Sequence, residues 1–141
     1  MKYFKNLIVA VIAILIQIPI IHAQNNTAGV PFSTYFSSQV YGGGIQNWNI
    51  TQKSNGLLYV ANNFGLLEYD GTAWNRFTIP GETKVRDVAI SNQGKIYVAS
   101  QGNFGYFFLN ELGQYEFLSL SDKLDDQYQA FDETWRVFLN D

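Results

Sequence analysis

Residues 55–77 read NGLLYVANNFGLLEYDGTAWNRF, and residues 93–117 read QGKIYVASQGNFGYFFLNELGQYEF. The two stretches are copies of one pattern, because Gly, Tyr, Val and Ala recur with the same spacing in Gly56–Ala61 and in Gly94–Ala99. Short runs of aromatic and β-branched residues alternate with turn dipeptides such as Asn-Gly and Asp-Gly, which is typical of antiparallel hairpins. Each copy contains four such runs, so the sequence predicts an all-β fold of four-stranded antiparallel units.

Four strands in about 40 residues is the size of one blade of a β-propeller, a fold that closes with about 4–8 blades. The sequence predicts two full blades, at residues 45–80 and 84–120, and the start of a third near residue 134, within a partial propeller that covers residues 45–141. Helix is expected only within residues 121–131, as a turn or two.

The two copies differ in the spacing of one glycine. The step from Gly65 to Gly105 is longer by two than the step from Gly56 to Gly94, which predicts two extra residues in the second copy near Gly102-Asn103. Tyr59 and Tyr97 occupy equivalent positions in what should be the most buried strands. Truncation of either to alanine is therefore expected to damage a closed propeller similarly, at a cost of about 3–5 kcal/mol.

The leader, residues 1–23, differs in composition from the rest of the chain. Lys2 and Lys5 precede an unbroken apolar run over residues 7–16, and Ala23 lies before Gln24 where a signal peptidase would cleave. Even when it is extended through Ile21, the apolar stretch has about 15 residues, fewer than the roughly 20 that span a bilayer. The segment therefore indicates a signal peptide cleaved between Ala23 and Gln24, with an uncleaved anchor as the alternative. The mature protein is expected to be exported to the periplasm.

Composition excludes several classes of function. The chain has no cysteine, so disulfides, thiolate metal sites, cysteine nucleophiles and lipoprotein anchoring are impossible. Its single histidine, His22, lies in the leader, so the mature chain has no Ser-His-Asp triad and no histidine-ligated metal. Beyond the leader, seven basic and 12 acidic residues give a net charge of −5 without a basic cluster, which argues against nucleic-acid binding. A pair of catalytic carboxylates or a calcium site remains compatible with this composition.

Residues 24–44 form an N-terminal segment ahead of the first repeat. Residues 30–41 carry apolar side chains at irregular intervals, and Gly42, Gly43 and Gly44 follow. No helical pattern comes after these glycines, as a phosphate-binding loop would require. We interpret them as a flexible turn into the first strand.

The repeat resembles the two-component regulator propeller repeat, whose blade motif centres on Leu-Trp-Ile-Gly-Thr followed by Gly-Leu-x-x-Tyr. Leu58–Asn62 and Ile96–Ser100 fill the first part, with tyrosine in place of the tryptophan and alanine in place of the glycine. Gly65–Tyr69 matches the second part closely. The similarity covers residues 45–138.

Proteins of this family carry a periplasmic propeller region. A triple-tyrosine immunoglobulin-like domain, a transmembrane helix and an intracellular histidine kinase or helix-turn-helix regulator then follow. The resemblance implies that this chain is the N-terminal fragment of a longer receptor, which senses a carbohydrate or another nutrient. The segment itself carries no catalytic constellation and no cofactor or metal motif. Its expected protein partners are the remaining blades and a second copy, as a homodimer.

Several side chains have a chemical alternative to a structural role. Trp48, Trp74 and Trp135 are candidate platforms for sugar rings, but their fixed places within the repeats favour packing between blades. Two groups of acidic residues are candidate calcium ligands: Asp70 with Glu68, and Asp122 with Asp125 and Asp126. Neither group has the spacing of a calcium loop, so we interpret them as turn and solvated-loop residues.

Three functions are compatible with these patterns. The first is ligand sensing in a signalling receptor, and the second is a secreted scaffold whose blade edges recruit a partner protein. The third is a carboxylate-dependent carbohydrate-active enzyme, in which Asp87 and Glu133 would act as acid and base near Tyr106. The residues that bind the sensed ligand are not identified by the sequence.

Overall fold

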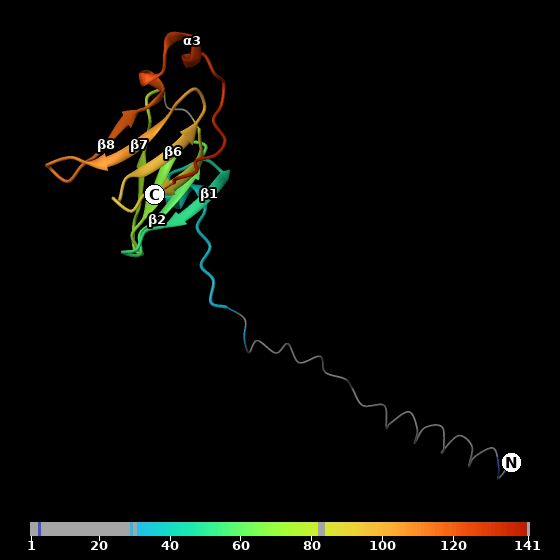
Figure 1. Ribbon diagram of the computed structural model, residues 1–141. Helices are drawn as coiled ribbons and strands as arrows, with labels where there is room; N and C mark the ends of the chain where they lie inside the picture. Colours follow the sequence, from blue (N-terminus) through green and yellow to red (C-terminus); the bar gives the residue numbers. More distant parts are fainter. Residues whose placement is uncertain (1–2, 4–28, 30, 82–83, 141) are drawn as a thin grey trace. The chain divides into compact units, whose positions relative to one another are not determined.

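A computed structural model of the chain describes residues 3, 29, 31–81 and 84–140 (Figure 1). The chain divides into two compact units, Met1–Thr34 and Tyr35–Asp141, and the helices and strands named below lie in the second unit.

The predicted signal peptide lies outside the described residues apart from Tyr3, and so do the two residues at its cleavage site, Ala23 and Gln24. None of the helices in the described part of the chain has the length and apolar character that a membrane span needs.

The fold is all-β, as the sequence predicts. In the described part of the chain, eight strands form two four-stranded antiparallel sheets, each with its strands in sequence order. The first sheet contains β1 (Asn47–Gln52), β2 (Leu58–Asn62), β3 (Gly65–Tyr69) and β4 (Trp74–Phe77). The second sheet contains β5 (Val85–Ile90), β6 (Ile96–Ser100), β7 (Phe104–Leu109) and β8 (Tyr115–Ser119). The short helices are α2 (Ser38–Tyr41), η1 (Ser121–Lys123) and α3 (Asp126–Gln129).

The helical turns fall where the sequence places them, with one addition. Both η1 and α3 lie within residues 121–131, whereas α2 is a single turn in the N-terminal segment that the irregular apolar spacing did not indicate. In the sheets, the turns at Gly56 and Gly94 have φ angles of 94° and 79°, the left-handed backbone that glycine adopts without a steric penalty. The hairpin signals in the sequence therefore reported real chain reversals.

The two sheets pack face to face, with β1 beside β5 (Figure 1). Their shared core contains Tyr59 and Leu66 from the first sheet, and Ile96, Val98 and Phe107 from the second, all at most 3% exposed. Burial of a large apolar side chain contributes about 1.5–3 kcal/mol, so this interface is a principal source of stability. Each sheet alone would leave this face in water.

The hairpins β2–β3 and β6–β7 have the same register, so the expectation of two extra residues at the second turn was wrong. Val60 pairs with Leu67 and Val98 pairs with Gly105, which keeps the spacing between the copies equal on both strands. Gly105 therefore lies two residues farther from its hairpin turn than Gly65 does. Strand pairing and turn length set the register. The two glycines are required for a different reason.

Gly65 and Gly105 are required because the fourth strand of each sheet passes close to their Cα atoms. A Cβ atom at Gly65 would lie 2.4 Å from the backbone oxygen of Phe77, and one at Gly105 would lie 2.1 Å from the backbone oxygen of Leu118. Atoms cannot approach so closely, so a side chain at either position would push the neighbouring strand away. The repeated glycine marks a backbone contact.

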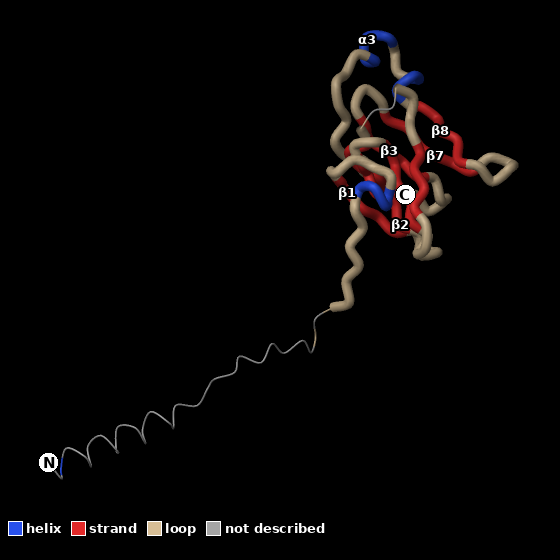
Figure 2. The backbone as a smooth tube through the Cα atoms, turned by 180° about the vertical axis from the view of Figure 1, so that it is seen from behind, coloured by secondary structure: helices blue, strands red, loops and turns tan. Residues whose placement is uncertain are grey.

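Residues 35–44 cover the outer face of the first sheet, and we call them the N-terminal cap. Phe36 and Tyr41 pack against Val60, Leu67 and the edge of β4, where α2 lies (Figure 2). The cap gives the first sheet a second buried face, so β2 and β3 are buried on both sides.

The glycines of the cap are held in place, which corrects their interpretation as a flexible turn. The amide of Gly44 donates to Asn62 Oδ1, and Asn62 Nδ2 donates to the Gly44 carbonyl, both at 2.7 Å. A Cβ at Gly43 would lie 2.9 Å from Asn62 Oδ1. The glycines let the chain pass close to a fully buried asparagine, which satisfies the backbone polar groups there.

Residues 134–140, where the third repeat was expected to begin, contain no strand. An isolated bridge joins Gln101 to Glu133 just before them. In both sheets the first strand forms its ladder with the second strand of the same sheet. Within the described residues, no strand follows residue 134. Residues 134–140 therefore have no second strand to pair with, as β1 has β2 and β5 has β6.

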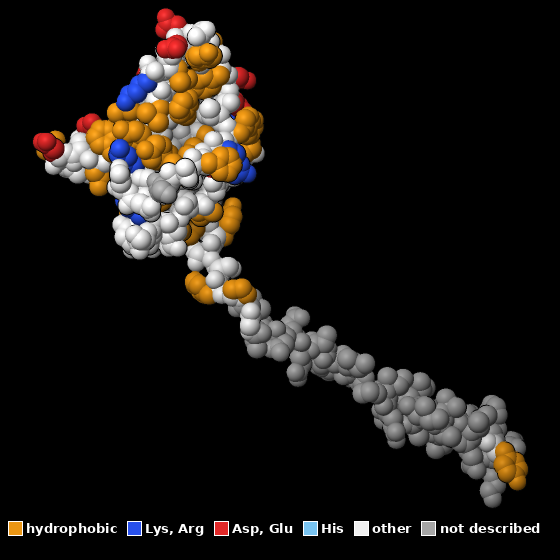
Figure 3. All heavy atoms as spheres, in the orientation of Figure 1, with side chains coloured by type: hydrophobic (Ala, Val, Ile, Leu, Met, Phe, Trp, Pro, Cys, Tyr) orange, Lys and Arg blue, Asp and Glu red, His pale blue; other side chains and the backbone are white. Residues whose placement is uncertain are grey.

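The outward face of the second sheet is less covered than the outward face of the first. Tyr97, Tyr106 and Phe108 pack against one another there, and each remains half-buried. In the orientation of Figure 1, hydrophobic side chains gather over β6, β7 and β8 (Figure 3). We call this surface the open face. Although Tyr59 and Tyr97 are equivalent in the repeat, only Tyr59 is fully buried in this chain.

Candidate functional site

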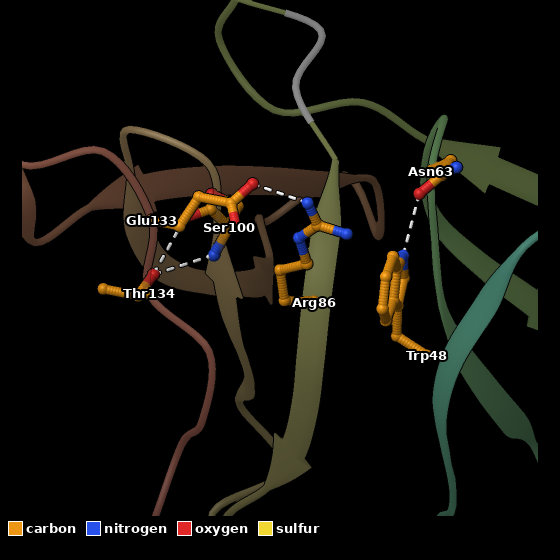
Figure 4. A network of polar contacts seen from close by, with 6 residues as sticks. All are labelled: Trp48, Asn63, Arg86, Ser100, Glu133 and Thr134. Carbon is orange, nitrogen blue, oxygen red and sulfur yellow. Dashed lines mark hydrogen bonds and ion pairs between the residues drawn. The ribbon is translucent and has the colours of Figure 1, made fainter.

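Each sheet has a bulge at the same position of its first strand. The pairing register shifts at Trp48 in β1 and at Arg86, the equivalent residue of the second repeat, in β5. A bulge inserts one residue more than the partner strand provides, and it re-aims the side chain of that residue. Figure 4 shows the result: the indole of Trp48 and the guanidinium of Arg86 lie side by side between the two sheets.

The guanidinium of Arg86 contacts two indoles, which also contact each other. Its central carbon is 4.1 Å from the ring centre of Trp48 and 4.6 Å from that of Trp135, and the two indoles meet edge to face at 5.9 Å. Trp48 and Arg86 are at one position of the two copies, and Trp135 lies where the sequence predicts the start of a third. Cation–π attraction favours such a stack, more strongly when it is desolvated.

A buried ion pair completes the stack. Arg86 Nη2 donates to Glu133 Oε1 at 2.5 Å, and the two side chains are 7% and 13% exposed (Figure 4). Arg86 Nε is also buried and makes no hydrogen bond within the described part of the chain. Charge-assisted hydrogen bonds between buried groups are strong, but each charge depends on its partner.

Asp87, the next residue of β5, links three segments through one carboxylate. It accepts a short hydrogen bond from Asn49 Nδ2 in β1, and Asp87 Oδ2 accepts one from the amide of Val137 at 2.9 Å. Arg136 Nη1 lies 3.8 Å from Asp87 Oδ1. Asn49 and Asp87 are again at equivalent positions of the two copies, and Arg136 follows Trp135 at the predicted start of a third.

Thr134 ties the end of the chain to β6. The amide of Ser100 donates to Thr134 Oγ1 at 2.9 Å, and the amide of Thr134 donates to the Ser100 carbonyl at 3.0 Å (Figure 4). Trp48 Nε1 donates to Asn63 Oδ1 at 2.8 Å on the other side of the stack. These bonds fix the positions of both indoles around Arg86.

The candidate catalytic pair is occupied by arginines. Asp87 is 3% exposed and faces Arg136 and two donors, while Glu133 pairs with Arg86. Tyr106 lies on the open face beneath the ammonium of Lys95, 4.6 Å from the ring centre. Each carboxylate is therefore engaged by an arginine, and Asp87 also by Asn49 and the amide of Val137.

The three tryptophans divide into two roles. Trp48 and Trp135 hold Arg86, as the expectation of packing between repeats requires. Trp74 does not lie between the sheets: it stacks on Tyr69 at 4.6 Å and meets Phe36 and Tyr41 of the N-terminal cap. Its position in β4 places it at the cap, which the sequence pattern did not reveal.

A buried polar triad, which the sequence analysis missed, crosses the interface between the sheets. Tyr59 donates through its hydroxyl to Glu68 Oε2 at 2.8 Å, and the hydroxyls of Tyr59 and Tyr115 are 2.7 Å apart. Burial raises the pKa of Tyr59 far above its usual value and also raises the pKa of Tyr115, with Glu68 adding to both shifts. These tyrosines are therefore kept neutral. The alternation of β3 puts Glu68 on the same face as the buried Leu66, and that was the available signal.

The acidic residues interpreted as turn residues do make turn contacts. Asp70 Oδ1 accepts hydrogen bonds from the amides of Thr72 and Ala73 at 2.7 Å, and these bonds lower the pKa of Asp70. In the described part of the chain, no three histidine, cysteine, aspartate or glutamate side chains form a group that could hold a metal ion. The other acidic group is exposed: Asp122, Asp125 and Asp126.

The fold and the site define an all-β protein of two four-stranded sheets, in which Arg86 and Asp87 contact both the first sheet and residues 133–137. Comparison with protein-family models, with curated proteins and with solved structures found no match in any of the three. The arrangement is suited to holding the two sheets in a fixed orientation, because Arg86, Glu133 and Asp87 are largely buried and each has a charged partner.

Proposed function

We propose that this chain forms two consecutive blades at the start of a β-propeller and serves as the extracytoplasmic ligand-sensing segment of a two-component-type receptor or transcriptional regulator. The observation that carries the proposal is the ladder of equivalent positions. Trp48 and Arg86, equivalent residues of the two copies, are in cation–π contact, and Arg86 makes a second such contact with Trp135, where the sequence predicts the start of a third copy. A repeat joined in this way is how a propeller is built, blade after blade.

The proposed role in sensing rests on the resemblance of the repeat and on the leader. Signalling propellers of this kind lie outside the cytoplasm, and a charged n-region followed by a short apolar run is how export signals are built. The likeness in Gly65–Tyr69 supports a receptor for a carbohydrate or another nutrient, with the remaining blades as partners.

Two experiments test this proposal. Intact mass and N-terminal sequencing of material exported from a bacterial host should give a product that begins at Gln24, and a membrane-bound product that retains Met1 would contradict the export step. The coding sequence after codon 141 should continue in frame to a transmembrane helix and to kinase or helix-turn-helix motifs. A stop codon at that point, together with a stable oligomer of the chain, would favour the scaffold instead.

A protein-interaction scaffold is the second candidate, and the open face favours it. Tyr97, Tyr106 and Phe108 form an aromatic cluster that is only half-buried. Aromatic residues are enriched at the centres of protein interfaces. The two candidates differ in their expected partner, since a scaffold recruits another protein where a receptor places its next blade.

A further inference from the structure

A polar groove of about 290 Å³ lies between the first turns of the two sheets. One wall is formed by residues 51–54 at the end of β1, and the other by residues 90–94 at the end of β5. The two turns are equivalent in the repeat, and a 2.8 Å backbone bond from the glycine to the residue three before it closes each one. Because both walls belong to this chain, the groove needs no further blade to exist.

An ammonium group reaches across this groove. Lys53 Nζ lies 3.4 Å from the place that a Cβ would occupy at Gly94, so the side chain extends from the turn of the first sheet to that of the second. The ion pairs within the described residues belong to Arg86 and Arg136, and none involves Lys53. Among the described residues that line the groove, none is acidic. Within the described residues no carboxylate therefore pairs with Lys53, in a chain whose net charge is −3.

A buried hydroxyl lies in the opposite wall. Ser91 Oγ has almost no contact with solvent and makes no hydrogen bond within the described residues. A buried donor without a partner is unfavourable, and a native protein usually satisfies it with a water or a ligand. The hydroxyls of Thr51 and Ser54 line the same groove. These groups give the site one cation and several neutral donors.

We infer that this groove binds a small oxyanion, a molecule whose carboxylate or phosphate group pairs with Lys53 Nζ and accepts a hydrogen bond from Ser91 Oγ. Charge-assisted bonds of this kind are short and strong. The volume is at the lower end of ligand pockets, so the ligand is small. The inference rests on the proposed sensing function, and it gives that function a place and a ligand charge.

The test is a titration of the ¹⁵N-labelled full chain carrying Phe108→Glu, a substitution on the open face that reduces association of the chain, followed by amide chemical shifts. The probes are inorganic phosphate, gluconate as a hydroxy acid, and glucose as an uncharged comparison. We expect saturable shifts at residues 53–54 and 91–94 with at least one anion. Lys53→Gln should weaken binding about tenfold because the charge-assisted bond is lost, and Ser91→Ala about threefold. Lys95→Gln is the matched control: it removes the same charge from a lysine that lies over Tyr106, and should change affinity less than about twofold.

The outcomes separate this inference from the proposed function. A response to only one of the two anions supports the site and identifies the source of the oxyanion. No saturable shift at these residues, or an equal loss with Lys95→Gln, overturns the site. Binding of glucose that Lys53→Gln leaves unchanged would also overturn it, while the sensing function would stand. If no probe binds and the exported product is absent, both fail.

Discussion

At the scale of single residues, the repeated glycines and the buried tyrosines carry the most specific consequences. At Gly65 and Gly105 the neighbouring strand passes so close that there is no room for a methyl group. Tyr59, Tyr115 and Glu68 place three polar groups inside the contact between the sheets, where each depends on the others for its hydrogen bonds. Both features are local demands that the fold imposes on side-chain choice.

Gly105→Ala is expected to lower the free energy of unfolding by about 3 kcal/mol, because the new methyl group would press on the backbone of β8. Gly113→Ala is the control: a Cβ there meets nothing within 4 Å, and only the strain of φ at 73° remains, about 1 kcal/mol. Chemical denaturation of both variants measures the difference. Equal losses would contradict the close approach of β8.

The tyrosine triad predicts a loss of stability at alkaline pH. The pKa values of Tyr59 and Tyr115 are raised in the folded protein above their usual 10.0. Above about pH 10 the unfolded chain therefore releases protons that the folded chain retains, and stability falls as the pH rises further. Below the usual pKa these two groups contribute no pH dependence.

Denaturation curves between pH 7 and pH 11 check this, with Tyr115→Phe as the test variant. It should lose about 1 kcal/mol at neutral pH with the hydrogen bond to Tyr59, and its decline above pH 10 should be shallower than that of the wild type. Tyr128→Phe is the comparison, because Tyr128 is 62% exposed. An unchanged alkaline slope in Tyr115→Phe would rule out the triad as its cause.

At the scale of elements, the strands were predictable from sequence and their neighbours were not. Alternation and Asn-Gly or Asp-Gly turns located the hairpins, since both are local signals. The bulges at Trp48 and Arg86, the position of Gly105 and the packing of Trp74 depend on contacts between segments far apart in sequence. The candidate site followed the same rule: Asp87 and Glu133 were found as residues, but their arginine partners were not.

The Arg86 stack gives a prediction about how the two sheets are joined. Arg86→Ala should lower the free energy of unfolding by about 3–5 kcal/mol, because it leaves the buried Glu133 carboxylate without its arginine partner. It also removes the group that the indoles of Trp48 and Trp135 both contact. Arg86→Met combined with Glu133→Gln should recover most of that loss, since it keeps the volume and removes both charges.

Arg136→Ala is the control for this prediction. Its side chain is 67% exposed, and its contact with Asp87 is 3.8 Å, so the loss should not exceed about 1 kcal/mol. Thermal and denaturant unfolding measure all three variants. If Arg86→Ala cost no more than Arg136→Ala, the stack would not hold the sheets together.

At the scale of the whole molecule, one outward face is covered and the other is open. The N-terminal cap covers the first sheet. Among the described residues, only 131–138 lie beside the open face of the second sheet, and a cavity of about 310 Å³ separates them from that face. Repeat stability comes largely from contacts between neighbours. Exposed apolar surface of this kind is expected to be adhesive.

We therefore expect the chain to associate or to bind hydrophobic dyes at micromolar concentration. Phe108→Glu should reduce both the scattering and the dye fluorescence, because it places a charge in the open face. Leu112→Glu is the matched control, since Leu112 is 82% exposed in the β7–β8 turn and outside that face. Static light scattering and dye fluorescence measure the effect, with circular dichroism to verify folding. A monomeric wild type that binds no dye and unfolds cooperatively would contradict the blade assignment.

The N-terminal cap also gives the molecule a direction. Phe36 and Tyr41 precede the sheet that they cover, so the N-terminal cap is synthesised before the strands against which it packs. The first sheet is then covered on that side as soon as β4 is synthesised, and the second sheet, which follows in the chain, packs on its remaining face. The two sheets can therefore assemble in the order in which they are translated.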